Sequence, residues 1–200
     1  MTLLGPAEPD ALMDDPRTEE RFHADDEHLP YWASPWPAAV MLAGFVVARP
    51  PRAGERVLEI GCGLGAAGLA AAITGRRVTL TDYDEDALAF AKASAELSGL
   101  NAVSFARLDW RDTAAPGRFD LILGADVLFE RRWVAPIAAF LAANLADDAA
   151  ALICDPNRST AEGFTEALSG VGLAATIHGV SACDTDGRRV SGSVYDIRRA

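Results

Sequence analysis

The 200-residue sequence is short of basic residues and of cysteine, and each shortage excludes a class of protein. Only 18 lysines and arginines stand against 29 aspartates and glutamates, which gives a formal net charge of −11. Because non-specific nucleic-acid binding requires clustered positive charge, we expect no nucleic-acid partner. The three cysteines are widely spaced and form no C-x-x-C pair, as is typical of reduced thiols, so we predict neither a disulfide framework nor a bound metal.

The sequence also lacks a long apolar run. No stretch reaches the roughly 20 residues of a membrane-spanning helix, and the N-terminus has no basic segment followed by an apolar one. We therefore expect no membrane partner and a cytoplasmic location. Half of the residues are nevertheless hydrophobic, which is enough for one domain with a full core and too little for two.

Acidic residues are concentrated at the N-terminus, where residues 1–30 carry nine of them and only two basic residues. This stretch is rich in proline and has no sustained apolar period. We predict an acidic, mobile leader over residues 1–28, with a short helix near residues 16–28, and a single folded domain over residues 29–200. The histidine and acidic side chains of residues 23–28 are metal-ligand types, but their spacing favours a solvated surface.

The most informative stretch is residues 56–82. An apolar strand is followed by a glycine-dense turn at residues 61–65, strong helix formers at residues 66–73 and a second apolar strand at residues 77–82. This order predicts a β–α–β unit whose turn lets the backbone approach a bound molecule closely, because glycine has no Cβ. Asp82 ends the second strand, where it can accept hydrogen bonds from the hydroxyls of a ribose. The stretch predicts a nucleotide-like cofactor.

Two cofactors fit this pattern. Three glycines within residues 63–68, followed by Asp82, satisfy the dinucleotide fingerprint G-x-G-x-x-G and would suit NAD. The alternating glycines begin earlier, however, at Gly61, and Glu59 precedes them at the end of the first strand. An acidic residue there suits a ligand with an ammonium group and is poorly placed beside a pyrophosphate. S-adenosylmethionine has an amino group and no phosphate, so it is the favoured cofactor.

The rest of the chain alternates between strand and helix patterns, which predicts a doubly wound α/β sheet. The last two strands are joined by a loop at residues 181–187 that is too short for a crossover helix, so we expect an antiparallel pair at one edge. The other helices are predicted at residues 37–48, 84–99, 133–146 and 159–170, and the other strands at residues 103–108, 119–126, 149–154, 173–178 and 193–199.

The glycine motif from Glu59 to Gly65 resembles that of the class I S-adenosylmethionine-dependent methyltransferases. The resemblance covers residues 30–200 and implies a mostly parallel seven-stranded sheet with an antiparallel last strand. It also implies that Asp109 accepts a hydrogen bond from the adenine amino group and that Trp110 covers the adenine ring. The full set of cofactor-binding residues implied is Trp36, Glu59, Gly61, Cys62, Gly63, Gly65, Asp82, Tyr83, Asp109, Trp110 and Ala125.

A second informative stretch is residues 119–130, where a continuous apolar run predicts a central parallel strand. Its end must lie at the same rim as the glycine turn, so Asp126 is either a carboxylate at the mouth of a pocket or a helix cap. Residues 126–130 look like the D-x-x-Y motif of the seven-strand protein-lysine methyltransferases, although Phe129 stands in place of the tyrosine. The resemblance implies catalytic roles for Asp126, Phe129 and Glu130.

These observations predict an S-adenosylmethionine-dependent methyltransferase that acts on an amine, with a protein lysine as the favoured substrate. Residues 31–37 resemble the tryptophan-containing N-terminal segment of the protein-lysine enzymes. Asp126 would orient the amine, with Glu130 as a weaker candidate, and Trp36, Phe129 or Trp133 could form an aromatic wall. The alternatives are a small-molecule N- or O-methyltransferase, an NAD-binding Rossmann oxidoreductase and a non-catalytic cofactor-binding subunit. No Tyr-x-x-x-Lys motif supports the oxidoreductase.

Overall fold

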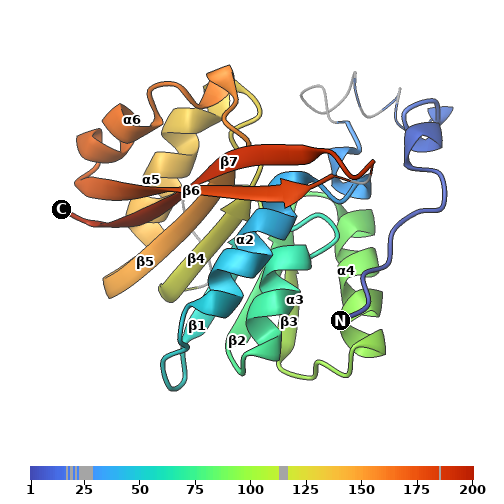
Figure 1. Ribbon diagram of the computed structural model, residues 1–200, viewed down its shortest axis with the longest axis horizontal. Coiled ribbons are helices and arrows are strands. Elements are labelled where there is room, and N and C mark those ends of the chain that lie inside the picture. The colour runs from blue at the N-terminus through green and yellow to red at the C-terminus, as the bar shows by residue number, and fades with distance from the viewer. Residues whose placement is uncertain (17, 19, 21, 23–28, 113–116, 185) are drawn as a thin grey trace.

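A central sheet with helices on both faces forms the body of the molecule (Figure 1). The computed structural model describes residues 1–16, 18, 20, 22, 29–112, 117–184 and 186–200. The strands in these ranges are β1 (Arg56–Ile60), β2 (Arg77–Asp82), β3 (Val103–Arg107), β4 (Phe119–Ala125), β5 (Leu145–Asp155), β6 (Leu173–Cys183) and β7 (Arg189–Arg199). The α-helices are α2 (Pro37–Ala48), α3 (Ala66–Ile73), α4 (Glu85–Leu97), α5 (Val134–Asn144) and α6 (Phe164–Gly170). Short 3-10 helices are η1 (Pro9–Leu12), η2 (Tyr31–Ala33), η3 (Arg131–Trp133) and η4 (Ser159–Ala161).

The strand order is β3-β2-β1-β4-β5-β7-β6. The first five strands in this order are parallel, whereas β7 pairs antiparallel with both β5 and β6. The order reverses between β1 and β4, and ligands of such sheets bind beside this switch point at the carboxyl ends of the strands. The predicted doubly wound sheet with a reversed last strand is confirmed.

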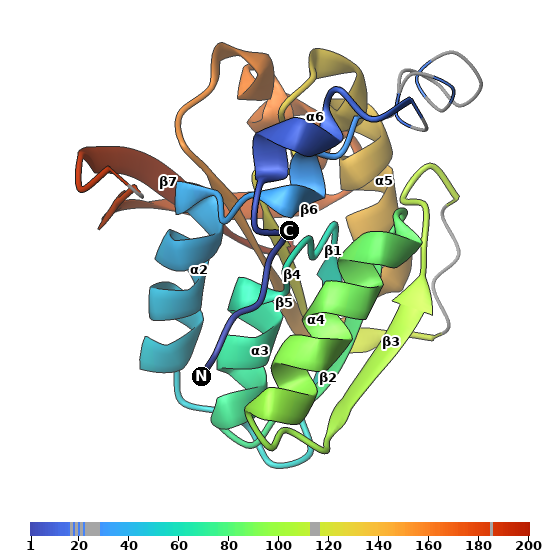
Figure 2. The same cartoon turned by 90° about the vertical axis from the view of Figure 1, so that its right-hand side faces the viewer.

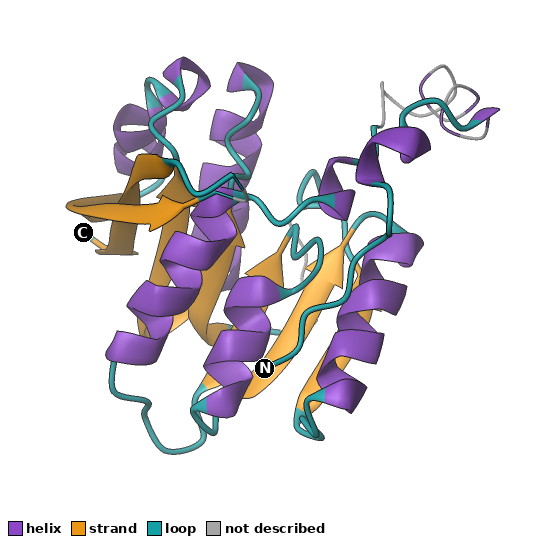
Figure 3. Ribbon diagram, turned by 45° about the vertical axis from the view of Figure 1, so that its right-hand side comes forward, coloured by secondary structure: helices purple, strands orange, loops and turns teal. Residues whose placement is uncertain are grey.

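Alternate residues of the central strands face two separate cores. Val57 and Leu121 face the core covered by α2, α3 and α4, whereas Leu58 and Ile122 face the core covered by α5 and α6. Strands buried on both faces read as continuous apolar runs, which explains why β1 and β4 were recognisable in the sequence. Figure 3 shows the helices distributed in front of and behind the strands.

The predicted β–α–β unit is confirmed with its expected bounds, from β1 through α3 to β2. In the turn between β1 and α3, the φ angles of Gly61, Gly63 and Gly65 are 56°, 51° and 83°, in the left-handed region that favours glycine. Gly68 serves close packing instead, since a Cβ there would overlap the Leu80 side chain of β2. The glycines therefore shape the turn and let α3 lie close against the sheet.

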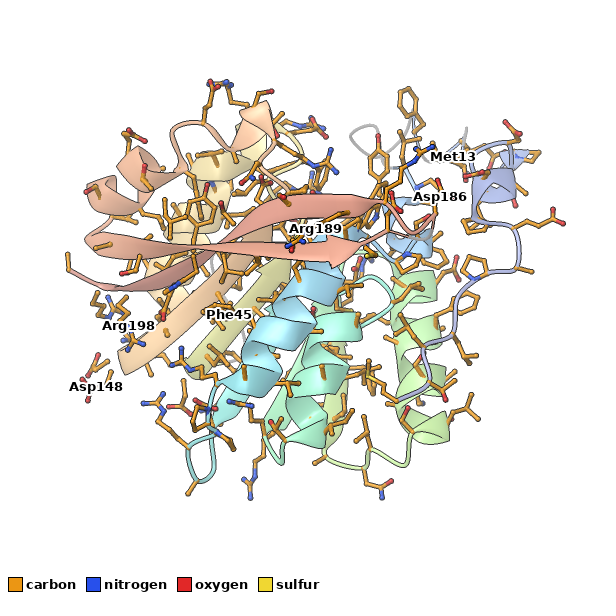
Figure 4. The ribbon with its side chains drawn as sticks, viewed as in Figure 1. Met13, Phe45, Asp148, Asp186, Arg189 and Arg198 are labelled. Carbon is orange, nitrogen blue, oxygen red and sulfur yellow. The ribbon has the colours of Figure 1, made fainter. Side chains whose placement is uncertain are left out.

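The C-terminal half differs from the prediction in three places. The strand β5 begins at Leu145 rather than at residue 149, so the helix before it, α5, ends at Asn144 rather than at residue 146. The strands β6 and β7 are longer than predicted. They pair as far as Cys183 and Arg189, so β6 runs into the expected loop, and Asp184 accepts the amides of Asp186 and Arg188 to close a tight turn between the strands. The helix predicted at residues 159–170 is instead η4 followed by α6, with Gly163 at a φ of 85° between them. Packing also joins distant elements, since the Phe45 ring of α2, labelled in Figure 4, lies 5.3 Å from the His178 ring of β6.

The first residues of the predicted leader run over the face of the molecule that α3 and α4 form (Figure 2), and they are hydrogen-bonded to α4. The Thr2 amide donates to Ser98 Oγ at 3.0 Å, and the Leu4 amide donates to Ser94 Oγ at 2.8 Å, one helical turn away. The sequence carried no signal that two serines of α4 would accept these amides, and the mobility of the leader stays a prediction. A domain boundary near residue 28 stays a prediction, and most of the helix predicted at residues 16–28 lies outside the described residues.

Within the described ranges, none of the helices has both the length and the apolar character needed to cross a membrane.

Candidate cofactor and substrate site

A cavity of about 510 Å³ opens at the carboxyl ends of β1 to β4. Its volume lies within the range of small-molecule sites, which is roughly 300 to 1,000 Å³. Most of the residues predicted for the site line it: Trp36, Gly61, Cys62, Gly63, Asp82, Tyr83, Asp109, Trp110, Ala125, Asp126, Phe129 and Glu130. Two predicted residues, Glu59 and Gly65, are not among its lining residues.

Glu59 lies behind the glycine turn. Its side chain is buried, and its Oε2 accepts a hydrogen bond of 2.8 Å from the Gly68 amide in the first turn of α3. Burial raises the pKa of Glu59 to about 8, although the Gly68 hydrogen bond lowers it and the nearby Asp82 charge adds to the rise. Glu59 therefore ties β1 to α3, and a direct contact with the cofactor stays a prediction.

Asp82 ends β2 and joins three parts of the cavity wall. Its Oδ2 accepts the Gly63 amide at 2.8 Å, and its Oδ1 accepts the Asp84 amide at 3.0 Å. Burial raises its pKa, while these amide hydrogen bonds oppose the rise. The Tyr83 amide is a third backbone donor to this carboxylate. A carboxylate has about four acceptor positions, so one remains for a ligand hydroxyl. Asp84 in turn caps α4 by accepting the Asp86 amide.

Gly61 and Cys62 begin the turn between β1 and α3, and both line the cavity. Burial, reinforced by the charges of Asp82 and Glu59, raises the Cys62 pKa well above its usual value, so the thiol is neutral. The Trp110 ring covers Gly61 so closely that a Cβ at this position would lie 2.8 Å from Trp110 Cζ3. A side chain at Gly61 would thus displace the indole ring from this wall.

Aromatic side chains line the part of the cavity beside the ends of β2 and β3. The Arg111 guanidinium lies 5.4 Å from the centre of the Tyr83 ring, and the Trp110 and Trp133 rings meet edge to face at 6.0 Å. Asp109 accepts hydrogen bonds from the Arg111 amide at 2.9 Å and from Arg111 Nε at 2.6 Å. Burial raises the Asp109 pKa, but the Arg111 hydrogen bonds outweigh it, and the pKa lies below its usual value.

Asp126 follows β4 with a φ of 57°, a left-handed conformation that aspartate tolerates better than most residues. Its carboxylate is buried and receives two hydrogen bonds from Arg158, at 2.6 Å from Nε and 2.8 Å from Nη2. The alternative that Asp126 caps a helix is wrong, because the next helical turn, η3, begins after Glu130. Arg158 was not predicted as a site residue. The only indication in the sequence is that it follows β5, whose carboxyl end lies at the same edge of the sheet as that of β4.

The wall beside Asp126 is aromatic. Trp36 Nε1 donates to the Tyr31 carbonyl at 2.6 Å, and the Tyr31 and Phe129 rings meet edge to face at 5.6 Å. Phe129 therefore packs against a tyrosine that comes from the N-terminal segment of the domain. Glu130 is more exposed and forms an ion pair of 2.7 Å with Arg132.

All four tryptophans of the sequence line this one cavity: Trp32, Trp36, Trp110 and Trp133. Trp32 links η2 to the start of α4, because its Nε1 donates to Asp84 Oδ2 at 3.0 Å. Trp133, whose helical position favours a core role, packs against the α5 and α6 core and also faces the cavity. Across the described ranges, no three His, Cys, Asp or Glu side chains gather into a possible metal site.

The strand order and the cavity at the carboxyl ends define a class I S-adenosylmethionine-dependent methyltransferase fold. The crystal structure of a TehB-like S-adenosylmethionine-dependent methyltransferase from Corynebacterium glutamicum has the same fold, with a TM-score of 0.62 and 20% identity. The match covers 96% of this chain and 100% of that chain.

The family model described as lysine methyltransferase matches residues 32–169, and the chain belongs to this family. Protein N-lysine methyltransferase METTL21A of Danio rerio is 37% identical over 117 residues, which are 54% of this chain and 53% of that protein. Histone-arginine methyltransferase METTL23 of Rattus norvegicus is 37% identical over 110 residues, 52% of this chain and 49% of that protein. The chain spans about half the length of these curated relatives. The fold and the family identify S-adenosylmethionine as the cofactor.

Proposed function

We propose that this protein transfers a methyl group from S-adenosylmethionine to the side-chain amine of a lysine in a protein substrate. The observation that carries the proposal is the Asp126 carboxylate, which lies at the rim of the sheet in the same cavity as Asp82. Membership of the lysine methyltransferase family supports the reaction. A substrate arginine is the second candidate, because the METTL23 relative is named for histone arginine.

The cavity has a cofactor half, around Asp82 and Asp109, and a substrate half, around Asp126 and Phe129. The residues of the cofactor half fit S-adenosylmethionine. We propose that the Asp82 carboxylate, which backbone amides orient, accepts hydrogen bonds from the ribose hydroxyls. Asp109 would accept the adenine amino group, and Tyr83 and Trp110 would cover the adenine ring. The turn and the rim would surround the methionine part of the cofactor with these residues: Trp36, Gly61, Cys62, Gly63 and Ala125. Glu59 and Gly65 would act through the turn, which they hold in shape.

Bound S-adenosylmethionine supplies an electrophilic methyl group on a sulfonium centre. The work left to the chain is to orient the amine in line with that methyl group and to exclude water. Only a neutral amine has the lone pair for attack, so we propose that Asp126 accepts a hydrogen bond from the amine N–H while water takes the proton. Phe129 and Trp36 would hold the alkyl chain and disperse the positive charge over their ring faces. Glu130 is a weaker candidate because it is more exposed and paired with Arg132.

A methyl-labelling experiment tests this proposal. The purified protein is incubated with cell lysate and S-adenosylmethionine labelled on its methyl group, and the labelled proteins are hydrolysed to amino acids. We expect labelled methyllysine that disappears with Asp82→Ala and decreases strongly with Asp126→Asn. The matched control is Asp147→Asn, an exposed aspartate outside the cavity. Label in methylarginine would favour the second candidate, and label in small molecules alone would contradict a protein substrate.

We also propose a cytoplasmic location. Its support is the state of the three cysteines, Cys62, Cys154 and Cys183, which are all free thiols as expected in a reducing compartment. Cell fractionation with an antibody against the protein tests this location.

A further inference from the structure

The ion pair between Asp126 and Arg158 closes the substrate half of the cavity. The Asp126 side chain is 6% exposed, whereas the Arg158 side chain that covers it is 38% exposed. Both residues line the cavity. An amine that approaches Asp126 from solvent therefore meets a positively charged guanidinium at the position it must take.

The groups around the Arg158 guanidinium would suit any organic cation. Asp126 binds it through two hydrogen bonds, and the centre of the guanidinium lies 6.0 Å from the Trp36 ring centre. A buried carboxylate and an aromatic face are the two groups that attract alkylammonium and guanidinium ions in proteins. The hydrogen bond to Asp126 raises the Arg158 pKa further, so its guanidinium stays charged throughout the accessible pH range.

The Arg158 side chain can leave this site while its backbone stays in place. The backbone amide of Arg158 donates to Asp155 Oδ1 at 2.7 Å, and the nearby Thr160 hydroxyl donates to the Leu128 carbonyl at 2.6 Å. These two hydrogen bonds hold the loop after β5. Among the described residues, the hydrogen bonds of the Arg158 side chain run to Asp126 alone, so a change of rotamer exposes the carboxylate.

We propose that Arg158 determines specificity by occupying the cation site of Asp126 and Trp36 as an internal competitor for the substrate amine. A tethered group competes at an effective concentration on the order of millimolar or higher, which a free amine in solution must overcome. A lysine of a protein that is docked through contacts elsewhere on the surface is also tethered near the site. Its effective concentration can therefore match that of Arg158. Arg158 thus selects lysines of a docked protein against free amines. This inference rests on the proposed function, since it names how that site chooses its substrate.

The test uses n-butylammonium, a minimal lysine side chain, with n-butanol as the neutral control. Both are titrated calorimetrically at about pH 7.5 into the full chain, with and without saturating S-adenosylhomocysteine. We expect Arg158→Gln to bind n-butylammonium about tenfold more tightly than the wild type, because the competitor is gone. Its n-butanol response should not change. The double variant Arg158→Gln, Asp126→Asn should lose the gain, since it lacks the carboxylate.

The control is Arg131→Gln, which removes an ion pair with Glu162 and a hydrogen bond to the Ser159 carbonyl beside the same loop. It should bind n-butylammonium like the wild type, so a gain in this variant would assign the effect to a loosened loop and overturn the proposal. Equal binding by wild type and Arg158→Gln, or a gain that survives in the double variant, also overturns it. If Arg158→Gln does not fold, Arg158→Lys decides, with an expected gain of about threefold, because lysine cannot form the bidentate pair.

The two proposals fail separately. A gain of amine binding in Arg158→Gln without any methyl transfer by the wild type contradicts the proposed function and supports the cation site. Methyl transfer to protein lysine without that gain supports the function and overturns the role of Arg158.

Discussion

Asp82 and Asp126 lie at the rim of one sheet, and different parts of the chain hold their carboxylates. Backbone amides of the glycine turn and of the segment before α4 bind Asp82. The side chain of Arg158, which is 32 residues distant in sequence, binds Asp126. A carboxylate bound to backbone amides is fixed as firmly as the fold, whereas one bound to a side chain can be released by a single rotamer change. The cofactor half is thus preorganised, and the substrate half can be opened.

The largest effect should come from removing the carboxylate on the preorganised side. Asp82→Ala leaves the Gly63 and Asp84 amides without their acceptor and removes the proposed ribose contact. We expect the affinity for S-adenosylhomocysteine to fall about 100-fold, or about 3 kcal/mol, by calorimetry. Unchanged affinity would show that the ribose does not bind here.

Asp126→Asn probes the other side of the comparison. The amide keeps the shape of the side chain but cannot neutralise Arg158 or orient an amine as strongly. We expect turnover of the labelled protein substrate to fall about 30-fold, or about 2 kcal/mol in activation free energy, while cofactor affinity stays within about twofold of the wild type. A parallel loss of cofactor binding would mean that the two halves of the site are not separable.

Glu59→Gln tests how the preorganised half depends on pH. The pKa of Glu59 is raised to about 8 in the folded protein, so between its unfolded value and pH 8 the folded state binds more protons than the unfolded state. The wild type therefore loses stability as pH rises through this window. Glutamine can still accept the Gly68 amide and does not titrate. The free energy of unfolding of the variant, taken relative to that of the wild type, should therefore rise by about 1 to 2 kcal/mol from pH 6 to pH 8. Urea unfolding of both proteins at both pH values measures this difference. An equal change in the free energy of unfolding of the two proteins would refute the prediction.

The smallest effect should come from Glu130→Gln. Glu130 is more exposed than Asp126 and its partner Arg132 lies only two residues away, so its charge is screened by solvent. We expect turnover to fall by less than about threefold. A loss of turnover as large as that of Asp126→Asn would contradict the proposal that Asp126 is the main group that orients the amine and Glu130 the weaker candidate.

The same contrast explains what the sequence could predict. The strand, turn and helix of residues 56–82 carry their signals locally, in apolar runs and closely spaced glycines, and their bounds match the prediction. Asp82 and the rim of β4 followed from the general geometry of parallel sheets. These features make up most of the cofactor half of the site.

The substrate half depends on side chains brought together by tertiary packing. Nothing near Arg158 in the sequence indicates that its guanidinium turns toward Asp126, and nothing near Tyr31 indicates that its ring meets Phe129. The contact of Leu4 with Ser94 depends in the same way on two segments that are 90 residues apart. Such pairings are set by three-dimensional fit, for which a single sequence carries no periodic signal.

The gathering of every tryptophan of the chain around one cavity has a practical consequence. Indole emission responds to the polarity and to the quenching groups of its surroundings. In this protein the entire tryptophan fluorescence signal originates from the site itself, without background from the rest of the molecule. The unlabelled chain is therefore its own optical sensor, and cofactor arrival, amine entry and product release can be followed in a stopped-flow instrument without any attached dye.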